Sequence, residues 1–77
     1  MDKNEQNNYK QRFINEYVEL KNRYKKLHKM LTKYDACRLG FIPTCPIDML
    51  RTQEDIMLKY LSILEARAIV EDVELPE

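Results

Sequence analysis

The sequence predicts an all-α fold in which two long helices, joined by one loop, form an antiparallel hairpin. The chain has 77 residues, which is enough for one small domain. Apart from Pro76, its glycine and proline residues all lie between positions 40 and 46, so the long stretches on either side contain no helix breaker. Both stretches repeat their apolar residues at helical spacing.

The first helix is expected at residues 9–34, after a polar, flexible N-terminal segment at residues 1–8. Apolar residues recur at spacings of three and four along it, as in the seam of a coiled coil. Lysine and arginine fill most other positions from 21 to 33, where no acidic residue occurs. The seam consists of Phe13, Tyr17, Leu20, Tyr24, Leu27, Leu31 and Tyr34.

A linker at residues 35–45 is expected to join the helices. Gly40 suits a left-handed backbone conformation near the end of the first helix. Phe41 and Ile42 are too apolar for a solvated loop, and we expect them to pack back onto the helices.

The second helix is expected at residues 46–71, and residues 72–77 are expected to form a C-terminal tail. Pro46 suits the first helical position, with Thr44 or Cys45 as the capping residue. Two matched helices and one linker favour an antiparallel hairpin.

Apolar residues of the second helix form columns of residues seven positions apart. At 100° per residue these columns span an arc of about 160°, whereas one partner helix needs a stripe of about 100°. The excess apolar surface predicts that the chain associates with copies of itself. The columns are Leu50, Met57 and Leu64; Met49, Ile56, Ile63 and Val70; and Leu61 with Ala68.

A polar column, Gln53, Tyr60 and Arg67, lies within this apolar arc. Polar groups there are costly unless they are paired. In one interpretation they form hydrogen bonds across a helix seam and fix its register. In the other they line a polar pocket between subunits. The sequence leaves both open.

The balanced total charge conceals an uneven distribution. Residues 1–45 carry ten basic and five acidic side chains, whereas residues 46–77 carry three basic and eight acidic ones. The two halves can attract each other within or between chains. The basic run from Lys21 to Lys33 is either a solvated helix face or a surface that recognises phosphate. Because the whole chain is neutral, DNA is not an expected partner.

Other function classes find little support. With one histidine and one glycine, the sequence offers no recognisable catalytic group and no glycine-rich phosphate loop, so we expect no enzymatic activity and no cofactor. Cys37 and Cys45 are eight positions apart, and we expect no metal site. No apolar run is long enough to span a membrane and the N-terminus is polar, which favours a cytoplasmic protein with reduced cysteines.

A family resemblance adds to these patterns. The stretch from Tyr9 to Leu20, followed by Lys25, Lys26 and Leu27, resembles the first helix of the hairpin domain of phage anti-CBASS and anti-Thoeris sponge proteins and related gut-phage proteins. Similar positions of the second helix are Leu50, Gln53, Met57, Tyr60, Leu61, Ile63, Leu64, Glu65 and Arg67. The resemblance covers roughly residues 9–69, whereas the linker is unlike that of the sponge proteins.

The resemblance implies a homo-oligomer, often a hexamer, that binds cyclic oligonucleotides or cyclic ADP-ribose-type signals between subunits without cleaving them. It would thereby silence a bacterial immune signal in the host cytoplasm. The ligand-binding residues that it implies are Tyr9, Arg12, Lys25, Lys26 and Arg67. Two alternatives remain: a structural or protein-binding module without a small ligand, and a weak nucleic-acid binder.

Overall fold

The computed structural model describes residues 3–76 and contains two helices, α1 (Lys3–Asp35) and α2 (Ile47–Glu71), with no strand in that range. The predicted all-α hairpin is therefore confirmed. Helix α1 begins earlier than the expected start at Tyr9, and α2 begins one residue later than expected. Residues 1 and 2 of the expected N-terminal segment lie outside the described residues.

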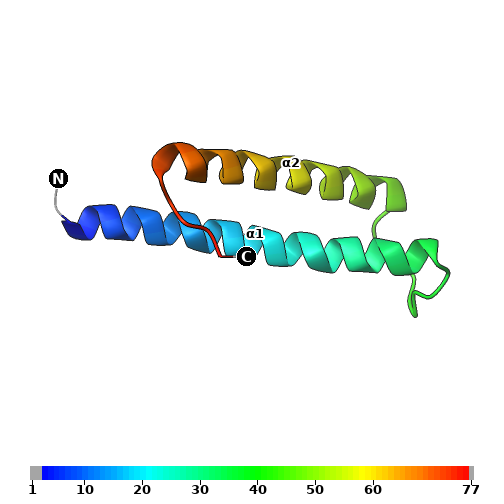
Figure 1. Cartoon of the computed structure of the whole chain (residues 1–77). Coiled ribbons are helices and arrows are strands. Elements are labelled where there is room, and N and C mark those ends of the chain that lie inside the picture. Colours follow the sequence, from blue (N-terminus) through cyan, green and yellow to red (C-terminus); the bar gives the residue numbers. More distant parts are fainter. Residues whose placement is uncertain (1–2, 77) are drawn as a thin grey trace.

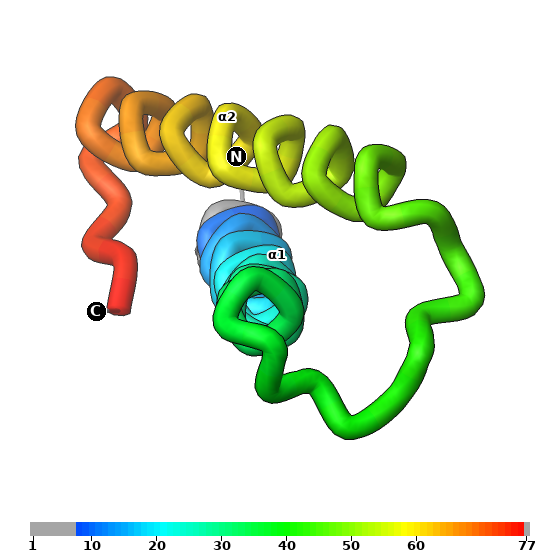
Figure 2. Tube along the Cα trace, turned by 90° about the vertical axis from the view of Figure 1, so that its right-hand side faces the viewer, coloured from blue at the N-terminus to red at the C-terminus, as the bar shows by residue number. Residues whose placement is uncertain are grey.

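The two helices run in opposite directions, and α1 extends beyond the end of α2 (Figure 1). Viewed along α1, α2 crosses it obliquely (Figure 2). The molecule is elongated, with extents of 52 × 20 × 18 Å. An oblique crossing concentrates close packing near the crossing point, so the seam cannot be buried equally along its length.

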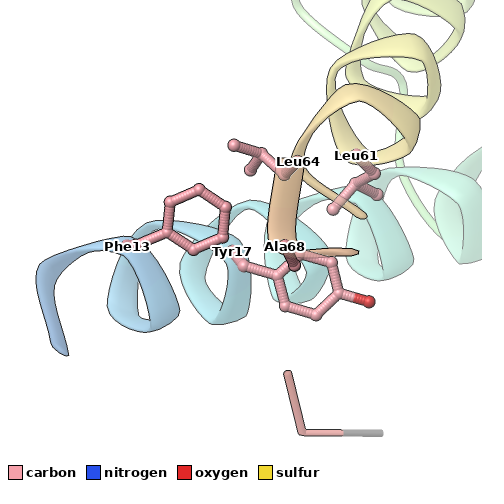
Figure 3. Packing of buried hydrophobic residues seen from close by; sticks show 5 residues of the cluster. All are labelled: Phe13, Tyr17, Leu61, Leu64 and Ala68. Atoms are coloured by element: carbon pink, nitrogen blue, oxygen red, sulfur yellow. The ribbon is translucent and has the colours of Figure 1, made fainter. Parts of the chain in front are cut away.

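The main core lies where the C-terminal half of α2 crosses the N-terminal half of α1, and there the side chains of the two helices point toward each other (Figure 3). Leu64 is fully buried and packs among the others. Burial of each such large side chain contributes about 1.5–3 kcal/mol. The buried cluster consists of Phe13, Tyr17, Leu61, Leu64 and Ala68.

The predicted seam is buried unevenly. Leu31 is buried near the loop end of α1, and Met57 is buried on α2. Leu20, Tyr24 and Leu27 are half-buried, and Tyr34 is 43% exposed. The seam is therefore buried near both ends and only half-buried between them, and its last residue is exposed.

An ion pair and a hydrogen-bonded pair join the helices toward the loop. The Arg51 guanidinium donates hydrogen bonds to both carboxylate oxygens of Asp35, one of them from Nη1 at 3.2 Å. His28 Nδ1 lies 2.7 Å from Glu54 Oε2, and the His28 ring stacks on Tyr24 with 5.7 Å between centroids. These exposed pairs contribute little energy each, but they fix the antiparallel register.

Both helices end in a Schellman motif without glycine. At the end of α1, Cys37 has φ 59°, and the Arg38 N–H donates to the Lys33 carbonyl at 2.8 Å. At the end of α2, Asp72 has φ 58°, and the Val73 N–H donates to the Ala68 carbonyl at 2.8 Å. The expectation for Gly40 was therefore wrong, because Cys37 takes the left-handed position and Gly40 has no positive φ.

Two expectations for the linker were also wrong. Phe41 is 59% exposed and Ile42 is 92% exposed, so neither side chain is buried against the helices. The linker extends away from α2 before it returns (Figure 2), which keeps these side chains from the core. Pro46 is the capping residue itself rather than the first helical residue, and no side chain caps α2.

The C-terminal tail packs against the helix pair. After the turn at Asp72, it descends across α1 (Figure 1). Val73 and Leu75 are half-buried against the main core. The tail thereby covers one flank of the crossing, beside Tyr17 and Lys21.

Candidate functional site

The flank of α2 opposite the tail carries Arg67. Glu65, beside the tail, and Arg67 are two residues apart, which separates them by about 200° around the helix. Ile63 and Val70 lie one turn on either side of Arg67, and both are exposed. Arg67 therefore lies beside an unpaired apolar surface.

The apolar surface is the column of residues seven positions apart that the sequence indicated on α2. We call it the α2 stripe, and it consists of Met49, Ile56, Ile63 and Val70, which are 62%, 58%, 59% and 85% exposed. These fractions agree with the excess apolar width expected of α2. No segment of residues 8–76 buries the stripe.

At the Glu71 end of α2, Tyr9, Arg67 and Glu71 form a closed hydrogen-bonded cluster. The Tyr9 hydroxyl donates to Glu71 Oε1 at 2.6 Å. Arg67 Nε donates to Glu71 Oε2 at 3.2 Å, and Arg67 Nη2 donates to the Tyr9 hydroxyl at 3.0 Å. The cluster thus fixes the Nε–Nη2 edge of the guanidinium, while Nη1 donates to no atom of the described residues.

The core supports the cluster from beneath. The Arg67 guanidinium carbon lies 4.7 Å from the centroid of the Phe13 ring, a distance typical of a cation–π contact. Hydrogen bonds from Tyr9 and Arg67 lower the pKa of Glu71 below its usual value of 4.5, and the bond from Tyr9 contributes more. Hydrogen bonds with Tyr9 and Glu71 raise the pKa of Arg67. Both side chains are therefore charged at neutral pH.

The polar column of α2 lies at the edge of the core rather than inside it. The Arg67 side chain is 43% exposed, and Tyr60 is 41% exposed. The Tyr60 hydroxyl donates to the Glu16 carboxylate across the seam, whereas Gln53 is exposed. Tyr60 and Arg67 both form bonds between the helices, as the register interpretation requires.

The structure brings together only part of the predicted ligand-binding set. Tyr9 and Arg67 touch through a hydrogen bond. Arg12 is exposed one turn along α1 from Tyr9. Lys25 and Lys26 are also exposed, but they lie about 24 Å from Tyr9 along the axis, at 1.5 Å per residue. One copy of the chain therefore cannot gather all five residues around one small ligand.

Sequence reasoning missed two members of this cluster, Glu71 and Phe13. Glu71 follows Arg67 by four positions, the spacing at which opposite charges meet on a helix, so this signal was present. Phe13 was assigned to the seam, and it is indeed buried there. Its second contact, with Arg67, depends on how α2 crosses α1.

A second candidate is a hollow of about 630 Å³ at the linker. Its lining is mostly apolar and includes Asp35 but no lysine, arginine or histidine. Such a lining does not suit an anion. The remaining lining residues are Tyr34, Cys37, Leu39, Phe41, Ile42 and Pro43.

Two other kinds of site are absent from the part of the chain that the structure describes. Neither helix there is long and apolar enough to cross a membrane. Within the same residues, no three potential metal-ligating side chains come together.

The fold and the cluster define a helical-hairpin protein with a surface suited to binding. Residues 7–69, most of the chain, match the family model described as Sequestin, and the chain therefore belongs to the Sequestin family. The family name denotes sequestration, a binding role rather than a catalytic one. Neither the curated proteins nor the solved structures contain a match to the chain.

Proposed function

We propose that the chain sequesters a cyclic nucleotide signal of bacterial immunity, on behalf of a phage, and does not cleave it. The observation that carries this proposal is the Arg67 guanidinium, oriented by Tyr9 and Glu71 and supported by Phe13 beside an exposed apolar stripe. An oriented guanidinium suits bidentate recognition of a phosphate. Membership of the Sequestin family and the family resemblance support the same role.

The ligand would lie between copies of the chain. The α2 stripe is apolar and exposed, and burying it against a second copy would remove most of that surface from water. Arg67 borders the stripe, so such packing would bring it to the edge of a subunit interface. This arrangement supports a homo-oligomer, for which the family resemblance implies a hexamer.

The remaining cations would come from other copies. Lys25 and Lys26 lie too far along α1 to reach the Arg67 of the same chain. A neighbouring copy could supply them, while Arg12 is close to Tyr9 in its own chain. Tyr9 is 43% exposed, and its ring would stack on a base. A ligand with several phosphates would thus contact several subunits at once.

Binding without cleavage is consistent with the chemistry of the cluster. Hydrolysis of a phosphodiester needs a group that accepts a proton from the attacking nucleophile. Glu71 is the carboxylate of the cluster, but its pKa is lowered by Tyr9 and Arg67. In the free chain this carboxylate is a weaker base, and both of its oxygens accept hydrogen bonds, so it does not suit the role of a general base.

Calorimetric titration tests the proposed function. The ligands are cyclic di- and trinucleotides and cyclic ADP-ribose isomers, titrated into the native protein, Arg67→Ala and Arg23→Ala, which removes an exposed arginine of α1. We expect one ligand to bind with Kd below about 10 μM and Arg67→Ala to lose at least about tenfold in affinity. Arg23→Ala should bind normally. Absence of binding across the panel, or release of linear products, would contradict the proposal.

Light scattering on a gel-filtration peak tests self-association. Ile63→Lys places a charge in the α2 stripe and should dissociate the oligomer, because burying an unpaired charge is costly. The matched control is Leu58→Lys, at a leucine that is 47% exposed on the other flank. A native chain that is monomeric at micromolar concentration would overturn this part.

The α2 stripe also favours one alternative, a structural or protein-binding module without a small ligand. The two functions differ in one result. An oligomer that forms through the stripe but binds no nucleotide of the panel would establish the module in place of the sponge.

A further inference from the structure

Glu71 occupies an unusual position for an acidic residue. It is the last residue of α2, and Asp72 follows it in the left-handed turn. The C-terminal end of a helix carries partial negative charge, which favours cations and disfavours carboxylates. The last turn of α2 contains no lysine, arginine or histidine. The helix dipole therefore does not favour a carboxylate at this position.

Glu71 contacts Arg67 directly and also through the Tyr9 hydroxyl. Its Oε2 accepts from Arg67 Nε at 3.2 Å, and its Oε1 accepts from the Tyr9 hydroxyl at 2.6 Å. Tyr9 in turn accepts from Arg67 Nη2 at 3.0 Å. The carboxylate, with the bridging hydroxyl, thus covers the Nε–Nη2 edge, one of the two edges through which a guanidinium makes a bidentate contact with phosphate.

We propose that Glu71 is an internal counter-ion that occupies Arg67 in the free protein, and that a phosphate group binds by displacing it. The inference rests on the proposed function, since it assigns a residue that opposes binding at the same site. A carboxylate and a phosphate both present paired oxygen acceptors to a guanidinium, so they compete for the same edge. Glu71 is only half-buried, so its side chain has room to move away.

The exchange favours ligands with several phosphates. A ligand with one phosphate replaces one anion at Arg67 with another and gains little. A ligand that also contacts cations of neighbouring subunits gains additional charge-assisted bonds for the same displacement. Glu71 thereby raises the Kd of every phosphate ligand by a similar factor, and only a ligand with additional contacts of this kind still binds tightly.

The test is Glu71→Gln, which removes the charge and keeps the shape. The probe is pyrophosphate, followed through the NMR signals of the arginine Nε–H groups. We expect the variant to bind pyrophosphate at Arg67 about tenfold more tightly than the native protein, the factor that about 1.4 kcal/mol produces. The double variant with Arg67→Ala should lose this gain entirely.

Glu65→Gln is the matched control. Glu65 is also on α2, also accepts a tyrosine hydroxyl, from Tyr17 at 3.2 Å, and lies on the opposite flank from Arg67. Both substitutions change the net charge equally, so a general electrostatic effect would appear in both. Equal gains in the two variants would contradict a specific role of Glu71.

The remaining outcomes separate this inference from the proposed function. Equal or weaker binding of pyrophosphate by Glu71→Gln would overturn the inference, because Glu71 would then orient Arg67 for the ligand rather than compete with it. No pyrophosphate signal at Arg67 in either protein would also overturn it. A gain with pyrophosphate, but no cyclic nucleotide bound by either protein, would support the inference while contradicting the proposed ligand.

Discussion

The two flanks of the helix crossing carry similar chemistry but differ in what covers them. On one flank, Tyr17 donates to Glu65, and Lys21 Nζ lies 5.5 Å from the Tyr17 ring centroid. On the other, Tyr9 donates to Glu71, and Arg67 lies over Phe13. The C-terminal tail packs on the first flank and leaves the second open beside the α2 stripe.

This difference suggests a division of roles. The chain covers the Glu65 flank with its own tail, as is typical of a surface that serves folding. The Arg67 flank keeps an oriented cation and an apolar stripe exposed, as is typical of a surface that serves binding. Similar tyrosine–glutamate pairs therefore have different proposed roles because only one flank is covered.

The largest expected change in stability follows truncation of a core residue, and a much smaller change is expected on the Arg67 flank. Leu64→Ala should destabilise the fold by about 2–5 kcal/mol, because Leu64 is fully buried and its truncation leaves a cavity. Its neighbour Ile63 is 59% exposed, and Ile63→Ala should change the stability of the monomer by less than about 0.5 kcal/mol. Denaturant melts at low protein concentration would measure both. Equal losses would show that the open flank already serves folding within one chain.

The next largest effect on stability is expected in the C-terminal tail, which packs on the Glu65 flank. Leu75→Ser should destabilise the fold by about 1 kcal/mol, because it removes a half-buried contact from the core. Thermal melts would measure the loss, with Glu74→Ser as the control at an exposed neighbour. An unchanged melting temperature for Leu75→Ser would mean that the tail does not stabilise the covered flank.

A smaller effect is expected at the turn that starts the tail. Asp72 has φ 58°, a conformation that glycine adopts without strain, so Asp72→Gly should stabilise the chain by about 0.5–1 kcal/mol. Cys37→Gly at the corresponding turn of α1 should act similarly, since Cys37 has φ 59°. Gly40→Ala should cost little, because Gly40 has no positive φ and its surroundings are open. Melting temperatures would rank the three variants, and a loss in either glycine variant would contradict the assignment of these turns.

The smallest expected effect is the contribution of Glu71 to the pH dependence of folding stability. The pKa of Glu71 is lowered below 4.5 in the folded chain, chiefly by the Tyr9 hydroxyl. The carboxylate therefore stabilises the fold above pH 4.5, and this contribution is lost as pH falls through the lower folded pKa. Tyr9→Phe should reduce that acid-dependent loss, which denaturant melts between about pH 3 and 6 would detect. An identical pH profile for the variant would show that Tyr9 does not hold the Glu71 carboxylate.

Much of the fold could be predicted because it depends on local spacing. Apolar residues spaced three and four positions apart predicted the helices, and the position of the glycine and proline residues predicted the linker. The width of the apolar arc indicated the α2 stripe, which is exposed. The burial of Phe13 and Leu64 also follows from spacing, since each lies in the centre of its apolar face.

Long-range geometry determined the rest. The sequence could not show that α2 crosses obliquely or that the linker extends away from α2, so it did not indicate that Tyr34 and Ile42 are exposed. It gave the left-handed position to Gly40, whereas the hydrogen bonds that end α1 impose it on Cys37.

The candidate site divides in the same way. The sequence singled out Tyr9 and Arg67 through a resemblance and a polar column, and the spacing of Arg67 and Glu71 was available in it. Contact between Tyr9 and that pair joins residues 58 and 62 positions apart, which no local pattern encodes. By itself the sequence determined which faces are apolar and which residues carry charge. The crossing of the helices and the path of the tail decided which charged face stays open, because packing of distant segments alone determines what is covered.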